Sequence, residues 1–286
     1  MDVARSLATP DGATVAYRLW RPAAPRRVVV LLHGLASNAT RWSELVAHTS
    51  LKADWDILRL DLRGNGASAW RGRLGMGEWC ADLAGILDAE GYARAVLVGH
   101  CLGANVAIEF ASRHPDRVAR LVLIEPMPCE ALTGTLGTVA RLRALFVPVV
   151  GLVRALNALG LRRRRLRPLD LAEFDRETRA AVAPGAGLDV LVKRHASWSL
   201  DLRTTATAAY LQMLLAVSDR LPDPETLRAP GLALLSTGAA FTDPAITERW
   251  LARVPRCRIV RLDARHWIPT ERPEEMRRAI EEFCRA

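Results

Sequence analysis

The sequence predicts an α/β fold in which helices flank a mostly parallel central sheet and a helical insertion covers one edge of it. Strand-like and helix-like segments alternate along most of the chain, a pattern typical of βαβ units. Several strand-like segments are continuous apolar runs, as expected for strands buried on both faces. A Gly-x-Cys-x-Gly turn, Gly99 to Gly103, also stands between such a run and a helical pattern.

The N-terminal elements follow this alternation. Residues 12–20 alternate apolar and polar side chains and predict a half-exposed strand. The five residues 28–32 are all apolar and predict a buried strand. A helix is expected over 40–50, a strand over 56–62 and an amphipathic helix over 76–90, with Gly91 as its C-cap.

The C-terminal elements continue the pattern. Buried strands are predicted at 95–98 and 118–124, separated by a helix over 102–113. Further along the chain, strands are expected at 232–236 and 258–262, each followed by a helix, and these helices cover residues 245–253 and 273–285. Both halves of the chain therefore contribute to one sheet.

A long segment between the strands at 118–124 and 232–236 departs from this rhythm. Residues 127–230 are arginine-rich and helical in pattern, with breakers such as Pro148 and Pro168. An insertion of roughly a hundred residues is too long for an ordinary loop. We therefore expect residues 1–126 and 231–286 to form the core, and 127–230 to form a cap over the carboxyl edge of the sheet, where open α/β folds bind ligands.

The composition narrows the classes of protein to which the chain can belong. The chain has 286 residues and a net charge of +9, carried almost wholly by arginine. The arginine excess has two readings, a GC-rich genome or a basic face for an acidic partner. No nucleic-acid recognition motif accompanies the charge. The apolar stretch at 144–153 is shorter than the ~20 residues that span a bilayer.

The cysteines and the N-terminus bear on the compartment. The five cysteines are scattered, odd in number and without metal-ligand spacing, so neither disulfides nor a metal site is expected. The N-terminus shows no signal-peptide pattern. These features predict a cytoplasmic protein that needs no metal and no cofactor.

Cys101 is the candidate nucleophile. The flanking glycines, Gly99 and Gly103, permit the strained strand-to-helix turn that lifts a side chain above a sheet. The start of the following helix carries partial positive charge, which favours a thiolate. A Cys at this place predicts acyl-transfer chemistry through sulfur.

The order of the motifs resembles the α/β-hydrolase family. The match consists of His33-Gly34 after a buried strand, a glycine-rich loop at 61–68, the Cys101 turn and the late histidine His266. The resemblance implies the α/β-hydrolase fold with His266 as the base, although Arg265 replaces the usual glycine before it. It also implies an oxyanion hole formed by the backbone N–H groups of Leu35 and Leu102. The residues of the 61–68 loop are expected to be structural, as are the rings of His33 and His100.

The acid that would orient His266 stays open between two residues. Relatives usually place an aspartate where this chain has Phe241. Asp243 lies two residues further on, but Asp243-Pro244 is also an ordinary helix N-cap. Glu125, at the end of the predicted strand 118–124, is the other candidate, because some α/β-hydrolases take their acid from there.

Among capped members of this fold with a cysteine nucleophile, the chain resembles the Dieckmann cyclases of polyketide–nonribosomal peptide pathways. The resemblance implies that Cys101 accepts an acyl group from a carrier-protein thioester and releases it by cyclisation to a tetramic acid or a related ring. Two alternatives remain: a thioesterase or small ester or lactone hydrolase, as in dienelactone hydrolases, and a non-catalytic binding protein.

The partner and the substrate pocket are the remaining expectations. Carrier proteins are usually acidic, and Arg162 to Arg165 with Arg167 form a basic cluster that would suit one, or simply a solvated helix end. Trp267, Trp198 and Phe146 are candidates for the lining of an apolar pocket.

Overall fold

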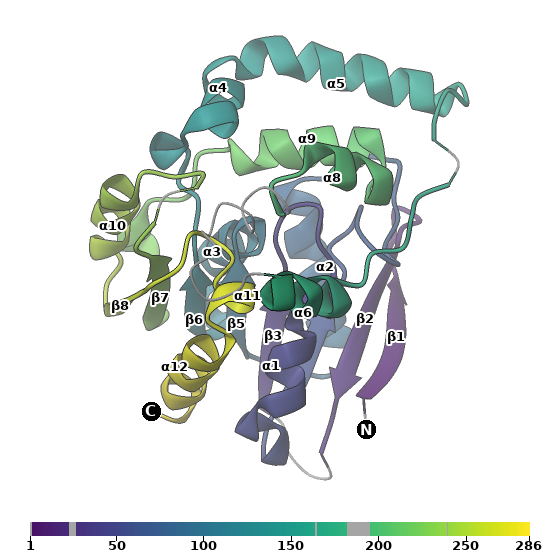
Figure 1. Cartoon of the computed structure of the whole chain (residues 1–286). Helices are drawn as coiled ribbons and strands as arrows, with labels where there is room; N and C mark the ends of the chain where they lie inside the picture. The colour runs from purple at the N-terminus through teal and green to yellow at the C-terminus, as the bar shows by residue number, and fades with distance from the viewer. Residues whose placement is uncertain (1, 23–26, 164, 182–194, 239) are drawn as a thin grey trace.

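The computed structural model describes residues 2–22, 27–163, 165–181, 195–238 and 240–286 (Figure 1). Its centre is an eight-stranded sheet in the order β1-β2-β4-β3-β5-β6-β7-β8. β1 pairs antiparallel with β2 and β2 with β4, and the remaining pairs are parallel. The strands are β1 (Asp2–Ala8), β2 (Thr14–Trp20), β3 (Val28–Leu32), β4 (Asp56–Leu60), β5 (Ala95–His100), β6 (Val118–Ile124), β7 (Gly231–Ser236) and β8 (Cys257–Leu262).

The predicted mostly parallel sheet is confirmed, and helices lie in its crossovers and after its last strand. These are α1 (Ser43–His48), α2 (Met76–Ala89), α3 (Leu102–Arg113), α10 (Pro244–Ala252), α11 (Ile268–Glu271) and α12 (Pro273–Arg285). Short 3-10 turns complete them: η1 (Ala39–Trp42), η2 (Ser50–Ala53), η3 (Pro115–Arg117), η4 (Cys129–Ala131) and η5 (Pro224–Thr226). One strand, β1, lacks the alternation that would have marked it, because it is a largely exposed edge strand.

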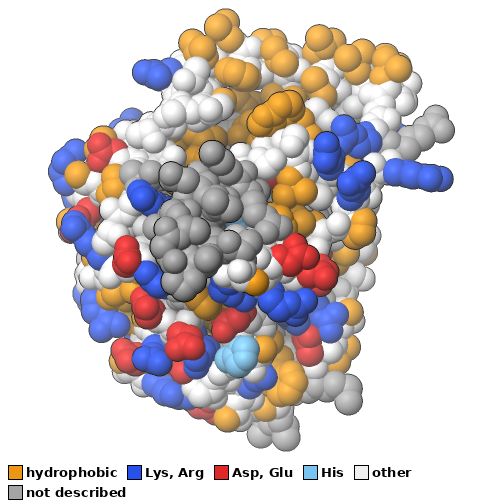
Figure 2. Space-filling view, in the orientation of Figure 1, with side chains coloured by type: hydrophobic (Ala, Val, Ile, Leu, Met, Phe, Trp, Pro, Cys, Tyr) orange, Lys and Arg blue, Asp and Glu red, His pale blue; other side chains and the backbone are white. Residues whose placement is uncertain are grey.

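The segment between β6 and β7 contains α4 (Gly134–Arg141), α5 (Arg143–Ala158), α6 (Leu171–Ala181), α8 (Trp198–Thr204) and α9 (Thr207–Val217), and no strand in its described part. In Figure 1, α4, α5, α8 and α9 lie above the sheet, with α5 outermost. Figure 2 shows hydrophobic side chains along this outer side. Leu145, Leu152 and Leu159 are among the exposed ones.

No single described helix is long and apolar enough to cross a membrane; α4 and α5 together reach the length and composition, but they are bent by 89°.

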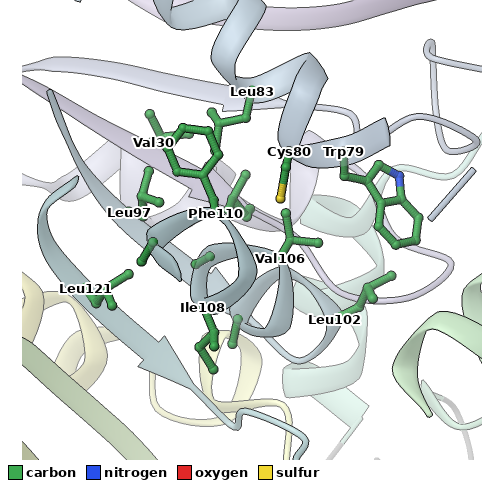
Figure 3. Close-up of a cluster of buried hydrophobic side chains, with 14 of the residues drawn as sticks. Val30, Trp79, Cys80, Leu83, Leu97, Leu102, Val106, Ile108, Phe110 and Leu121 are labelled. Atoms are coloured by element: carbon green, nitrogen blue, oxygen red, sulfur yellow. The ribbon is translucent and has the colours of Figure 1, made fainter. Parts of the chain in front are cut away.

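Two apolar layers hold the sheet. One joins α2, α3 and α9 to the strands, and Figure 3 shows its centre, where Phe110 and Val106 of α3 pack near Leu83 of α2 and Val30 of β3. The other layer joins α1 and α12 to the opposite face, with Trp42 and Ile280 among its members. Because both faces are covered, the central strands β3, β4, β5 and β7 are buried throughout, whereas β8 at the sheet edge is partly exposed. The carboxyl ends of the parallel strands meet at the edge below the cap.

Candidate active site

Cys101 stands at the sharp turn between β5 and α3, in a backbone conformation that side-chain-bearing residues rarely adopt. Its φ is 55° and its ψ is −119°. A Cβ on Gly99 would lie 2.3 Å from the Gly103 carbonyl oxygen, and one on Gly103 would lie 2.2 Å from the Leu32 carbonyl oxygen. Both glycines are therefore required by close backbone contacts, which hold the strained turn in place.

The backbone donors predicted for the oxyanion hole lie beside this turn. Leu102 is the first residue of α3, and Leu35 borders the same cavity as Cys101. A Cβ on Gly34 would come within 3.2 Å of the Cys101 Cβ, so the loop after β3 passes close to Cys101. Within the described residues, neither the Leu35 nor the Leu102 N–H donates a hydrogen bond. Both groups can therefore serve an incoming oxygen.

His266 and Glu125 form a buried pair next to Cys101. The His266 Nδ1 is 3.2 Å from the Glu125 Oε2. The other oxygen of Glu125 accepts a hydrogen bond from the Ser236 backbone N–H. Glu125 has a φ of 50°, so it too is held in the left-handed region directly after β6. Strain of this kind persists where the surroundings determine the conformation.

The environment of His266 favours its protonated form. Burial opposes the charge, but hydrogen bonding and charge from Cys101 and Glu125 outweigh it and raise the pKa of His266 to about 10. The ring is held by edge-to-face contacts with Phe241, at a centroid distance of 4.8 Å, and with Trp267, at 5.3 Å. An imidazolium beside Cys101 is the partner that a thiolate needs.

Asp243, the other candidate acid, has a different place. Its carboxylate accepts hydrogen bonds from the backbone N–H groups of Ala245 and Ile246, so it caps the N-terminus of α10. The carboxylate in contact with His266 is that of Glu125, and the expectation that Asp243 could orient His266 finds no contact here. Phe241, where relatives usually carry an aspartate, instead packs its ring against the imidazole.

A cavity of about 460 Å³ opens above Cys101, beneath the cap. Trp267 and Trp198 both border it, although the Trp198 side chain is also 69% exposed. Phe146 does not: it lies half-buried on α5 and is absent from the lining, which corrects its expected place in the pocket. Met127 borders the cavity as well, with its Sδ 3.1 Å from the Cys101 Sγ.

Two other histidines near the site have structural roles. His33 is fully buried, with Nδ1 2.8 Å from the Gly34 carbonyl oxygen and Nε2 accepting from the Leu62 N–H. His100 has its Nε2 3.1 Å from the His266 carbonyl oxygen, and burial and nearby positive charge hold its pKa well below the ordinary value. Both rings therefore stay neutral and tie the loops of the site together.

A second set of polar residues lies at the cavity, and no sequence motif indicated it. Arg41 of η1 donates through Nη1 to the Asp175 carboxylate, 2.6 Å away, and to the Thr270 hydroxyl, 2.7 Å away. His195 contacts Asp175 through Nε2 at 3.1 Å. Asp201 is a further lining residue, and burial raises its pKa to about 7. No local pattern marks these residues, because they come together only through the packing of the cap.

In the described ranges, no three His, Cys, Asp or Glu side chains are grouped as metal ligands would be.

Comparison with known proteins agrees with this architecture. Residues 27–147 match the family model described as the alpha/beta hydrolase fold. A hydrolase from Pseudomonas aeruginosa PA01 superposes with a TM-score of 0.72 at 24% identity, covering 99% of this chain and 98% of that one. The enol-lactonase from Burkholderia xenovorans LB400 superposes with a TM-score of 0.70 at 20% identity, covering 99% and 100%. The chain has the α/β-hydrolase fold.

Curated relatives point to hydrolytic enzymes. The sn-1-specific diacylglycerol lipase ABHD11 of Mus musculus is 25% identical over 94% of this chain and 84% of its own length. The putative carbamate hydrolase RutD of Caulobacter segnis is 33% identical, but the match spans only 41% of this chain and 43% of that protein. The chain is thus similar to a lipase over most of its length and to a putative carbamate hydrolase over a shorter part.

Proposed function

We propose that this protein is an acyl-transfer enzyme in which Cys101 accepts an acyl group from a carrier-protein thioester and releases it by intramolecular Dieckmann-type cyclisation. The observation that carries the proposal is a cysteine at the strained turn, next to a buried His266–Glu125 pair and beneath an apolar cavity. Sulfur at this position exchanges one thioester for another.

The two half-reactions use the same residues. In the first, the Cys101 thiolate forms a bond to the thioester carbonyl carbon, the carbon–sulfur bond to the carrier breaks, and His266 can give its proton to the departing thiolate. In the second, the now neutral His266 can take a proton from the acidic carbon of the bound acyl chain. The resulting carbanion attacks the Cys101 thioester, a carbon–carbon bond forms, the carbon–sulfur bond breaks and the Cys101 thiolate leaves beside the protonated His266. The negative oxygen of each tetrahedral intermediate would lie at the Leu35 and Leu102 N–H groups.

The partner in this proposal is an acidic carrier protein that delivers its thioester on a phosphopantetheine arm. Arg162, Arg163, Arg165 and Arg167 are all exposed, whereas Arg164 lies outside the described residues. Figure 2 shows Lys and Arg side chains gathered on the side of the molecule beyond the end of α5. Exposed guanidinium groups attract carboxylates and raise association rates.

A hydrolytic role is the second candidate, and a specific observation favours it. The proteins to which the chain is similar include a diacylglycerol lipase, a putative carbamate hydrolase and an enol-lactonase. The same Cys101 acyl-enzyme would then be resolved by water rather than by a carbon nucleophile, as in a thioesterase or lactonase. Cys101 acylation is common to both candidates, and the product separates them.

The test is incubation with a β-ketoacyl-aminoacyl thioester of N-acetylcysteamine, followed by intact-protein mass and product analysis. We expect an acyl adduct on Cys101 and a tetramic acid product, both abolished in Cys101→Ala. Free acid as the only product would favour the hydrolase. Cyclisation by Cys101→Ala at the wild-type rate would refute the Cys101 mechanism. The absence of any adduct or turnover with the wild-type protein would also refute it and would support a binding role.

Background labelling of three other thiols, those of Cys80, Cys257 and Cys284, is expected to be low in such experiments. Burial raises the pKa of Cys80 and of Cys284 to about 12 and that of Cys257 to about 11, so these thiols remain protonated near neutral pH. Cys101→Ala is the matched control that assigns any remaining adduct.

A further inference from the structure

Arg41 is a buried cation whose hydrogen-bonding capacity is only partly used by the protein. It is 7% exposed and borders the same cavity as Cys101. Within the described residues, every hydrogen bond that it donates leaves from Nη1, toward Asp175 and Thr270. Its Nη2 and Nε groups have no protein acceptor there. A guanidinium has five N–H donors in a planar fork, so the unused side of the fork is available to a ligand.

Ser37 provides a second unused donor at the same wall. Its hydroxyl is buried and has no hydrogen-bond partner among the described residues, and the residue borders the cavity together with Arg41. Buried hydroxyl groups without a partner are costly, and each calls for an explanation such as a bound ligand. Ser37 also borders a neighbouring cavity of about 530 Å³, and the cavity that contains Cys101 is the one that Ser37 and Arg41 share.

The charge of Arg41 is held in place by its surroundings. Asp175 is nearly fully buried, and although burial favours its neutral form, Arg41 and His195 hold the pKa of Asp175 below its ordinary value. The Asp175 carboxylate meets only one nitrogen of the guanidinium, so it fixes the orientation of the fork without occupying it. After burial and the charge of His266, the charge of Arg41 also contributes to the lowered pKa of His100 on the cavity wall.

We propose that Arg41 and Ser37 form a subsite for a planar, delocalised oxyanion of the substrate, inside the cavity that contains Cys101. A guanidinium fork binds two oxygens on one side of a flat anion, and two sources offer that chemistry: a carboxylate and the enolate of a 1,3-dicarbonyl group. The inference rests on the proposed function for the location of the reacting carbonyl. It adds that the substrate also carries a planar oxyanion.

The cavity lining has apolar and polar members. Trp267, Trp198 and Leu136 suit an acyl chain. Arg41 and Ser37 are among the polar lining residues, together with Asp201 and Tyr210. Ligand pockets commonly combine apolar walls with a few polar groups that set orientation. A substrate anchored at Arg41 would place its acyl carbonyl at a set distance from Cys101, which selects for chain length.

The first test measures binding without chemistry. Octanoate, a 3-octanoyl tetramic acid and neutral octanamide are titrated into wild-type protein, Arg41→Lys and Ser37→Ala. Arg41→Lys keeps a cation for Asp175 but lacks the fork. We expect at least one of the two anions to bind wild-type protein about 10- to 100-fold more tightly than the amide, because hydrogen bonds to charged groups are strong. In Arg41→Lys this preference for an anion over the amide should fall. Which anion is preferred identifies the source.

The second test measures chemistry with matched thioesters of N-acetylcysteamine: an octanoyl chain, a β-ketoacyl-aminoacyl chain and a chain ending in a carboxylate. Arg41→Lys should raise KM for an anionic substrate about 10-fold and leave the octanoyl thioester unchanged. Equal loss for all three, or no anion preference in the binding test, would overturn the subsite. Anion preference without any Cys101 acylation would instead refute the proposed function alone. Thermal unfolding of each variant shows whether the fold is retained.

Discussion

The same cavity is bordered by two histidines that each contact a carboxylate, His266 with Glu125 and His195 with Asp175. The nitrogen–oxygen distances are nearly equal, 3.2 Å and 3.1 Å. The difference lies in the third member. Glu125 takes its other hydrogen bond from a backbone N–H, a neutral donor, whereas Asp175 is already paired with the Arg41 guanidinium.

The comparison shows that a histidine–carboxylate contact does not define a role. At His266, no other cation of the described residues pairs with Glu125, so the negative charge of Glu125 acts on the imidazole and helps to raise its pKa. At His195 the negative charge is shared with a permanent cation, and the group serves to hold Arg41 in position. The His266–Glu125 pair therefore favours a protonated imidazole, whereas the His195–Asp175 pair orients the guanidinium of Arg41.

Glu125→Gln is the change with the largest expected effect on this comparison. The amide can still accept the Ser236 N–H, but it no longer stabilises an imidazolium, so we expect Cys101 acylation to slow by roughly 100- to 10,000-fold. Single-turnover acylation monitored by intact mass checks this. A rate within threefold of wild type would show that Glu125 is only structural.

The matched change at the second pair, Asp175→Asn, is expected to act on stability. It leaves Arg41 buried without its counter-ion, and removal of one member of a buried ion pair costs about 3–5 kcal/mol. Chemical denaturation should show this loss, larger than that of Glu125→Gln. Equal unfolding free energies in the two variants would erase the distinction between the pairs.

The pH dependence of stability sharpens the account of His266. Its pKa is about 10 in the folded protein and close to 6.5 when unfolded, so the folded state binds the extra proton between these values. The stabilisation is fully present below pH 6.5 and is lost as pH rises through about 10. The difference in unfolding free energy between wild type and His266→Gln should therefore shrink from pH 6.5 to pH 10. A constant difference would mean that the folded His266 is neutral.

Asp243→Ala has the smallest expected effect. Its carboxylate caps α10, and loss of an N-cap costs about 1 kcal/mol. We expect a small decrease in thermal stability and acylation of Cys101 at the wild-type rate. A fall in rate comparable with that of Glu125→Gln would reinstate Asp243 as the acid.

Local patterns were sufficient for the fold class and for most strands. Continuous apolar runs such as 28–32 and 95–98 coincide with β3 and with the first residues of β5, because a strand buried on both faces needs no other signal. The glycines around Cys101 likewise predicted the turn. Gly99 is required by the Gly103 carbonyl within the motif, whereas Gly103 is required by the Leu32 carbonyl at the end of β3. Phe146 failed as a pocket residue because helical periodicity does not tell which side of a cap helix faces the cavity.

The linear chain thus predicted the parallel sheet, the turn at Cys101 and the late histidine, because each is marked by a pattern in the sequence. Only the tertiary structure distinguishes the contacts of the two candidate acids. Asp243 is taken up by N–H groups two and three residues ahead of it, whereas Glu125 meets partners 111 and 141 residues away. Arg41 and Asp175, 134 residues apart, were invisible for the same reason: their meeting depends on how the cap packs against the core, which no local spacing encodes.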